Sequence, residues 1–354
     1  MRVLSVVGNR PQFIKSAPVS AALRAGGIDE VVLHTGQHYD DELSAVFFEE
    51  LGLPEPTYRL EAGSGSHAEH LARMLPGIEE VVLSTRPAWT LVFGDTNSTL
   101  AGALAAAKAG SPVAHVESGL RSFDRTMPEE VNRAVVDQLS RLLLCPSERA
   151  VDNLRTEGIT EGVHLVGDVM LDASRLLTPL AAERSQKLGE LGVSPGGYLL
   201  LTLHRESNVK AEPLVRVARA LAGLDEAVLF PAHPRTRAAL ERTRTPLPDN
   251  VRLLLPLGYL DFSALVTGAR LVLTDSGGLQ KEAYWQKVPC VTLREETEWP
   301  ETVEAGWNQL AGTDPDQITT AVACAATRDV HPALYGNGRA AEEIVRLLAT
   351  IDPA

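Results

Sequence analysis

Short apolar segments that alternate with helical patterns constrain the fold of this 354-residue chain more than any other feature of its sequence. In the first half these segments cover residues 3–7, 31–34, 90–93, 112–116 and 142–145. Runs this short, bounded by Gly, Pro and Asp, are typical of parallel strands that are buried on both faces. The helical patterns between them, such as 10–24 and 97–108, indicate βαβ units with right-handed crossovers.

The same alternation starts again near Gly197. Apolar segments then follow at residues 198–203, 227–230, 251–254, 271–273 and 290–293. The sequence therefore predicts an α/β protein with two Rossmann-like domains, over residues 1–170 and 171–354, with the linker within 167–196. The helical segment 338–348 is expected to pack back on either domain.

Charge and cysteine content exclude several kinds of partner. The formal net charge is -13, so the chain as a whole repels nucleic acid and anionic membranes. The apolar run near Met1 is too short for a signal peptide or a membrane span. Three widely separated cysteines, Cys145, Cys290 and Cys324, indicate reduced, buried thiols in a cytoplasmic protein. An anionic ligand would need a local cluster of positive groups.

Polar residues follow nearly every predicted strand, and ligands of such sheets bind beyond the carboxyl ends of the strands. The segments that follow the strands are Asn9-Arg10-Pro11, Thr35-Gly36-Gln37-His38, Gly94-Asp95-Thr96-Asn97, Glu117-Ser118-Gly119, His204-Arg205, His233-Pro234 and Asp275-Ser276-Gly277-Gly278. These segments are therefore the candidate ligand-binding and catalytic positions.

Ser276, Gly277 and Gly278 form the strongest candidate for a phosphate-binding loop. The two glycines leave the backbone open, and the start of the next helix offers free N–H groups and a partial positive charge. A plain helix N-cap explains the same residues equally well. Glu282 could bind ribose hydroxyls or merely complement the first helical turn. Candidate counter-charges near strand ends are Arg10, Lys15, His204, Arg205, His233 and Arg235.

Carboxylates gather in the first half of the chain. Asp95 and Glu117 follow successive strands, while Glu129 and Glu130 open a helix after Pro128. Carboxylates brought together acquire divergent pKa values, which lets one act as an acid and another as a base. Helix capping is the alternative explanation for Asp95, Glu129 and Glu130. The histidines have no metal-ligand spacing, so no metal site is predicted.

Six motifs together resemble the non-hydrolysing UDP-N-acetylglucosamine 2-epimerases, in that family's order and from Met1 to about Leu310. They are Gly8-Asn9-Arg10-Pro11-Gln12-Phe13-Ile14-Lys15, Thr35-Gly36-Gln37-His38, Phe93-Gly94-Asp95-Thr96-Asn97-Ser98-Thr99, His115-Val116-Glu117-Ser118-Gly119-Leu120-Arg121, Pro128-Glu129-Glu130-Val131-Asn132-Arg133 and Thr274-Asp275-Ser276-Gly277-Gly278. Each motif alone is weak, but the set is specific.

The resemblance implies a GT-B-like pair of Rossmann domains with the site in an interdomain cleft, and a homodimer. It implies interconversion of UDP-N-acetylglucosamine and UDP-N-acetylmannosamine by anti elimination of UDP and re-addition to a 2-acetamidoglucal, without a cofactor. By resemblance, the catalytic residues are Asp95, Glu117, Glu129 and His204, the last placed near the UDP phosphates. The substrate-binding residues are Arg10, Lys15, Arg133, His233, Phe262 (beside uracil), Ser276, Gly277, Gly278, Glu282 and Arg294.

Departures from the family pattern leave alternatives open. Segments 10–15 and 46–51 also resemble relatives that act on UDP-2,3-diacetamido-glucuronate. Tyr39 and Asp40 replace the Arg and Met of enzymes that need UDP-N-acetylglucosamine as an activator, so activator-independent, hyperbolic kinetics are expected.

A GT-B glycosyltransferase and a nucleotide-sugar sensor are the rival classes of protein. A hydrolysing epimerase usually carries a fused kinase domain, for which this chain has no room.

Overall fold

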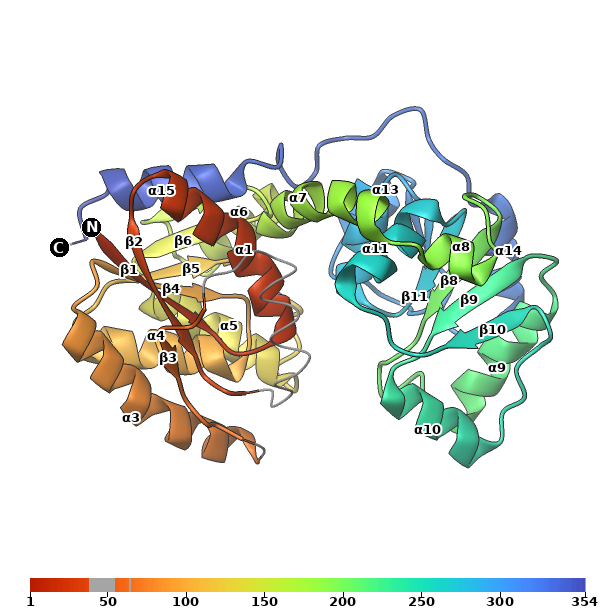
Figure 1. Cartoon of the computed structure of the whole chain (residues 1–354), viewed down its shortest axis with the longest axis horizontal. Coiled ribbons are helices and arrows are strands. Elements are labelled where there is room, and N and C mark those ends of the chain that lie inside the picture. Colours follow the sequence, from red (N-terminus) through yellow and green to blue (C-terminus); the bar gives the residue numbers. More distant parts are fainter. Residues whose placement is uncertain (38–54, 64, 354) are drawn as a thin grey trace. The chain divides into compact units, whose positions relative to one another are not determined.

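The chain forms two compact α/β units in a computed structural model that describes residues 1–37, 55–63 and 65–353, without the side chain of Arg10 (Figure 1). Unit 1 comprises Met1–Arg175 and Tyr335–Ala354, and unit 2 comprises Leu176–Leu334. The chain leaves unit 1 within helix α7 (Val169–Arg184) and re-enters it at Tyr335. The division expected at residues 170 and 171 falls inside this helix.

The described residues of unit 1 form a seven-stranded parallel sheet with the order β3-β2-β1-β4-β5-β6-β7. Its strands are β1 (Arg2–Val7), β2 (Asp29–His34), β3 (Tyr58–Arg59), β4 (Trp89–Phe93), β5 (Val113–Val116), β6 (Leu142–Cys145) and β7 (Val163–Leu165). Besides α7, its helices are α1 (Arg10–Ala25), α3 (His67–Thr85), α4 (Asn97–Lys108), α5 (Pro128–Leu139), α6 (Glu148–Thr156) and α15 (Ala340–Thr350).

Unit 2 has a six-stranded parallel sheet with the order β10-β9-β8-β11-β12-β13. Its strands are β8 (Tyr198–Thr202), β9 (Ala227–Pro231), β10 (Val251–Leu254), β11 (Leu271–Thr274), β12 (Cys290–Thr292) and β13 (Asn308–Leu310). Its helices are α8 (Lys187–Leu191), α9 (Ala211–Ala222), α10 (Pro234–Thr243), α11 (Tyr259–Gly268), α12 (Gly277–Trp285), α13 (Pro300–Glu304) and α14 (Pro315–Cys324).

Strand β8 shows why these apolar runs become central parallel strands. Leu199 and Leu201 join one buried cluster with α9 and α14, whereas Tyr198 and Leu200 join a second cluster with α11 and α12. Successive side chains of a strand point to opposite faces of the sheet. A strand covered by helices on both faces must therefore be apolar at successive buried positions, as residues 198–201 are, before the half-buried Thr202 ends this strand.

Helix α15 completes unit 1 although it follows unit 2 in the sequence. It packs against α1 (Figure 1), and the carbonyl of Leu348 accepts a hydrogen bond of 3.2 Å from the indole nitrogen of Trp89. The Asp172 carboxylate of α7 accepts a hydrogen bond of 2.8 Å from the backbone N–H of Ala341. This carboxylate caps the free N–H groups at the start of α15.

The predicted fold class is confirmed, since all ten apolar runs form strands of two parallel sheets. The edge strands β3, β7 and β13 were not predicted. The expected linker region contains α7 and α8. The expectation of three buried thiols is wrong for Cys324, which lies exposed at the end of α14. In the described part of the chain, no helix has the length and apolarity to span a membrane.

Candidate active site

Each sheet has one point at which its strand order reverses, between β1 and β4 in unit 1 and between β8 and β11 in unit 2. Ligands of doubly wound sheets bind beyond the strand ends at these points. In unit 1 the side chain of Gln12 joins the two turns concerned. It accepts a hydrogen bond from the backbone N–H of Gly8 at 2.8 Å and donates to the carbonyl of Phe93 at 2.8 Å.

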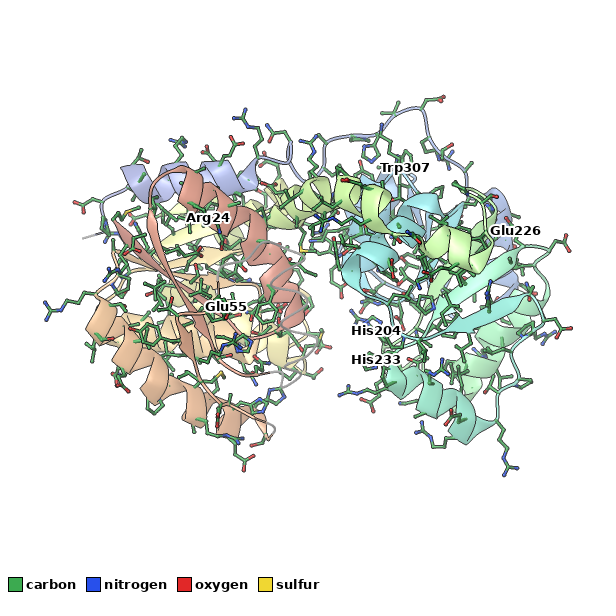
Figure 2. The ribbon with its side chains drawn as sticks, in the orientation of Figure 1. Arg24, Glu55, His204, Glu226, His233 and Trp307 are labelled. Carbon is green, nitrogen blue, oxygen red and sulfur yellow. The ribbon has the colours of Figure 1, made fainter. Side chains whose placement is uncertain are left out.

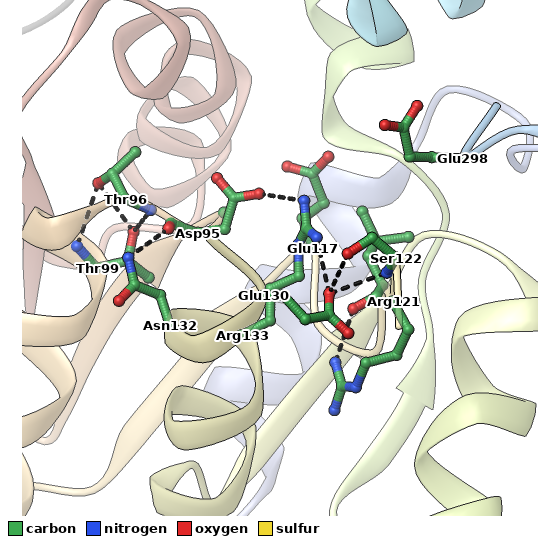
Figure 3. Close-up of polar contacts among 12 residues, drawn as sticks. Asp95, Thr96, Thr99, Glu117, Arg121, Ser122, Glu130, Asn132, Arg133 and Glu298 are labelled. Atoms are coloured by element: carbon green, nitrogen blue, oxygen red, sulfur yellow. Dashed lines mark hydrogen bonds and ion pairs between the residues drawn. The ribbon is translucent and has the colours of Figure 1, made fainter. Parts of the chain in front are cut away.

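A cluster of two cations and two carboxylates lies at the strand ends of unit 1, and Figure 3 labels three of its members, Asp95, Glu117 and Arg133. Lys15 of α1 forms an ion pair with Glu117, which follows β5. Arg133 of α5 bonds the Asp95 carboxylate, which follows β4, at 2.6 Å. Burial alone would lower the pKa of Lys15, but the charges of Glu117 and Asp95 raise it above its usual value. Lys15 therefore stays charged and compensates the two acids.

Unusual backbone conformations bring the two acids of the cluster together. Gly94, directly before Asp95, has a φ of 64°, and a Cβ atom there would lie 3.0 Å from Nζ of Lys15. Glu117 has a φ of 71°, which is uncommon for a residue with a side chain. Such conformations persist where the surrounding structure enforces them, and they are often found at active sites.

The two adjacent acids at the start of α5 have different environments. Glu130 is buried and accepts hydrogen bonds from the backbone N–H groups of Ser122 at 2.9 Å and Phe123 at 3.0 Å (Figure 3). It also pairs with Arg133 at 3.0 Å. Glu129 is exposed, and its carboxylate has no ion pair or hydrogen bond with the described residues. Glu130 therefore holds a loop, while Glu129 is available to a ligand.

In unit 2 a buried carboxylate orients the predicted catalytic histidine. Asp275, fully buried after β11, pairs with Nδ1 of His204 at 2.9 Å. The same carboxylate accepts hydrogen bonds from the backbone N–H of Arg205 at 3.0 Å and from the Asn208 amide at 3.2 Å. With Nδ1 engaged, Nε2 is the nitrogen that the half-exposed His204 can offer to a ligand.

The glycine-rich loop starts α12 as expected from the sequence. Ser276 is the N-cap residue, and its hydroxyl accepts a hydrogen bond from the N–H of Leu279 at 3.4 Å. Gly278 is exposed, and the nearest atom to a Cβ built there is 3.9 Å away. Glu282 lies half-buried one turn further along the helix. The exposed start of α12 leaves its free N–H groups open to an anion.

His233 lies close to His204 at the carboxyl edge of the sheet in unit 2 (Figure 2). It caps α10, since its ring accepts a hydrogen bond from the N–H of Arg235 at 3.2 Å. Desolvation, followed by the charges of Arg235 and His204, lowers the pKa of His233. The lowered pKa favours the neutral ring, which acts here as a hydrogen-bonding cap, and the suggested role of His233 as a counter-charge stays a prediction.

The two other predicted ligand residues of unit 2 contact the protein itself. Arg294 forms two bonds with Glu298, of 2.7 and 3.0 Å, and Arg205 forms a third of 3.0 Å. Burial would raise the pKa of Glu298, but hydrogen bonding and charge from Arg294 lower it to about 2. Phe262 of α11 is half-buried against the apolar cluster under β10 and β11.

Sequence reasoning assigned no role to three residues that organise these sites, namely Gln12, Asp275 and Glu298. The first two stand within recognised motifs, but nothing in the local pattern specifies their distant partners.

The predicted site residue Arg10 is described only by its place in α1. Tyr39 and Asp40 lie outside the described residues. Within the described ranges, no three His, Cys, Asp or Glu side chains group as metal ligands would.

These features describe two Rossmann-like units, with a cluster of ion-paired acids at the strand ends of one and a helix that starts at a glycine-rich loop in the other. A family model described as UDP-N-acetylglucosamine 2-epimerase matches residues 21–349. The chain belongs to the UDP-N-acetylglucosamine 2-epimerase family and is therefore an isomerase.

Relatives support the assignment over the whole chain. A UDP-N-acetylglucosamine 2-epimerase homolog of Methanococcus maripaludis is 46% identical, covering 99% of this chain and 100% of the relative. The UDP-2,3-diacetamido-2,3-dideoxy-D-glucuronate 2-epimerase of Pseudomonas aeruginosa is 42% identical over the same shares. The crystal structure of Methanocaldococcus jannaschii UDP-GlcNAc 2-epimerase with UDP-GlcNAc and UDP has a TM-score of 0.90 and 41% identity, covering 99% of both chains.

Proposed function

We propose that this chain interconverts UDP-N-acetylglucosamine and UDP-N-acetylmannosamine without hydrolysing either. The observation that carries the proposal is the cluster of Lys15, Asp95, Glu117 and Arg133 at the strand ends of unit 1. The C2 proton of such a sugar is weakly acidic, so its removal needs a base held in position. Membership of an isomerase family argues against the glycosyltransferase alternative.

The proposed reaction has two balanced steps. A carboxylate takes the C2 proton while the bond between C1 and the UDP oxygen breaks, which leaves a C1–C2 double bond and free UDP. A proton then returns to the other face of C2, and UDP re-forms its bond to C1. We assign the proton transfers to Asp95, Glu117 and Glu129, because two carboxylates must act on opposite faces of C2.

The departing UDP needs positive dipoles on its phosphates. For this role we propose His204 and the start of α12 at Ser276, Gly277 and Gly278, where the N–H groups are open. Arg10, His233, Phe262, Glu282 and Arg294 complete the proposed UDP site, with Lys15 and Arg133 beside the sugar. A guanidinium has five N–H donors, so Arg294 can bind UDP while it keeps its two bonds to Glu298.

The relative from Pseudomonas aeruginosa favours a second candidate substrate. That relative is a UDP-2,3-diacetamido-2,3-dideoxy-D-glucuronate 2-epimerase, and it is 42% identical to this chain. The proton chemistry at C2 is the same for both sugars. We also infer a homodimer in the cytoplasm, on the family resemblance and the cysteine content.

Incubation of either UDP-N-acetylhexosamine in D2O is expected to yield both epimers with deuterium at C2, because the abstracted proton exchanges with solvent while a carboxylate holds it. Proton NMR of the C1 and C2 signals measures both events. Epimerisation without deuterium at C2 contradicts the mechanism, and release of free N-acetylmannosamine indicates a hydrolysing enzyme. Turnover of the diacetamido-glucuronate alone identifies the second substrate.

Replacement of Glu129 by Gln is expected to lower kcat by about 10²-fold, since its exposed carboxylate acts on the ligand. The thermal unfolding midpoint should stay unchanged, because Glu129 has no partner among the described residues. Glu130→Gln is the matched control and should lower the midpoint, because that carboxylate holds the loop at Ser122 and Phe123. Near-normal turnover of the Glu129 variant would remove this residue from the proposed acids.

A further inference from the structure

A buried cluster of charged residues lies behind the acid cluster of unit 1 and has no role in the proposed chemistry. It consists of His115 on β5, Arg121 in the following loop and Asp137 on α5, and the exposed Glu157 after α6 pairs with Arg121 from the surface. The side chains of His115 and Asp137 are completely buried, at 0% exposure each. Charged groups this deep in a protein must be paired, so their partners can be identified.

Both ring nitrogens of His115 face oxygen atoms that can only accept hydrogen bonds. Nδ1 lies 2.7 Å from Oδ1 of Asp137, and Nε2 lies 2.7 Å from the backbone carbonyl oxygen of Gly94. A neutral imidazole carries one N–H and could satisfy only one of these contacts. Two hydrogen bonds therefore require two N–H groups, which makes the ring an imidazolium.

The pairing of Asp137 supports this protonation state, because an ionised carboxylate can only accept hydrogen bonds. Arg121 bonds Asp137 at 2.7 Å and both carboxylate oxygens of Glu157 at 2.7 Å. Glu157 is exposed, whereas Asp137 is completely buried, so it is Arg121 that keeps the Asp137 carboxylate ionised and its oxygens as acceptors.

The hydrogen bonds of this cluster end on the backbone beside both proposed acids. The Gly94 carbonyl that His115 holds belongs to the peptide preceding Asp95. Oδ2 of Asp137 accepts a hydrogen bond of 3.2 Å from the N–H of Gly119, at the end of the turn that begins with Glu117. The pair of His115 and Asp137 thus joins the end of β4 to the turn after β5.

We propose that His115 is a doubly protonated positioning residue that fixes the backbone of Asp95 and Glu117 relative to each other. The proposal rests on the proposed function for the role of the two acids. Glu117 needs such support, because its φ of 71° is unfavourable for a residue with a side chain. Misplacement of a reacting group by about 1 Å can cost about 10²-fold in rate.

Replacement of His115 by Gln or by Asn distinguishes the contributions of its two hydrogen bonds, to Gly94 and to Asp137. The amide nitrogen of Gln reaches the place of Nε2 and can still donate to Gly94, whereas that of Asn reaches only the place of Nδ1. His115→Asn is expected to lower kcat about 10-fold to 100-fold, with KM and UDP affinity within about two-fold. His115→Gln should recover most of kcat. Equal activity of the two variants, whether high or low, would overturn the positioning role.

The protonation state can be measured without any substrate. In the wild-type chain labelled with ¹⁵N-histidine, His115 is expected to show two ring N–H signals at neutral pH, identified by their loss in His115→Gln. A single ring N–H signal would refute the imidazolium, even if the Asn variant does not fold. If the wild type epimerises no UDP-sugar but shows two signals, the proposed function fails while the assignment of His115 stands.

Discussion

Replacement of Glu117 by Gln is expected to lower kcat by about 10³–10⁴-fold, the upper part of the range for general acid–base groups. Gln has nearly the same shape but cannot take a proton from C2. It also removes the partner of Lys15, whose ammonium group would then lie beside Asp95 without its nearest carboxylate. UDP affinity should change little, because the proposed UDP contacts lie mainly in unit 2. Steady-state kinetics and calorimetric titration with UDP measure the two quantities.

Asp95→Asn should have a comparable effect, since it removes the second acid and the partner of Arg133. Glu80→Gln, an exposed position on α3 of the same unit, is a suitable control and should leave kcat unchanged. If Glu117→Gln retained more than about a tenth of wild-type kcat, Glu117 would not be the proton-transferring group. A higher KM with an unchanged kcat would instead assign Glu117 to substrate binding.

The second large effect is expected for Asp275→Asn, which should destabilise unit 2 by about 2–4 kcal/mol. Oδ2 of Asp275 accepts from the N–H of Arg205 and from the Asn208 amide, and Oδ1 pairs with His204. In Asn an amide nitrogen replaces one of these two oxygens. This nitrogen is itself a donor and would face the donor groups that now bond the replaced oxygen. Each kcal/mol corresponds to a midpoint shift of about 2–4 °C for a domain of this size.

The effect of Asp275→Asn should depend on pH in a defined direction. Burial raises the pKa of Asp275, but hydrogen bonding and charge from His204 lower it below the usual value of 3.8. The ionised carboxylate thus stabilises the folded state fully above pH 3.8, and this contribution disappears as pH falls through the lowered pKa. The midpoint difference from wild type should therefore shrink at acid pH. An equally large difference at low pH would contradict this account, and the exposed Asp249→Asn serves as the control.

The central strands could be predicted because their side chains are apolar on both faces. The edge strands β3, β7 and β13 are only two or three residues long, and most of their residues are not buried. Such strands are formed by pairing with a neighbour rather than by their own apolar pattern, so periodicity does not reveal them. In the linker expected around residues 167–196, α8 has no buried residue, whereas α7 buries Ala173, Leu177 and Ala181 at helical spacing, a pattern that a search for strands overlooks.

The places of the candidate site residues at the strand ends could be predicted, but not the pairing between these residues. Asp95, Glu117 and Ser276 were found because they directly follow strands of a parallel sheet. The pairing of Arg133 with Asp95, and of Asp137 with His115, joins residues 38 and 22 positions apart. No local rule specifies such contacts, and Glu129 and Glu130 are equivalent in sequence although only one is buried.

The insertion of unit 2 into unit 1 has a consequence for synthesis of the chain. Helix α15 leaves the ribosome only after all of unit 2 has been made, although α1, which it covers, is among the first segments to emerge. Until then α1 is uncovered, and the indole of Trp89 lacks its acceptor at Leu348. The later half of the chain can therefore complete its core first. A chain truncated after residue 334 would hold all of the second unit joined to a first unit that lacks α15, with α1 left uncovered.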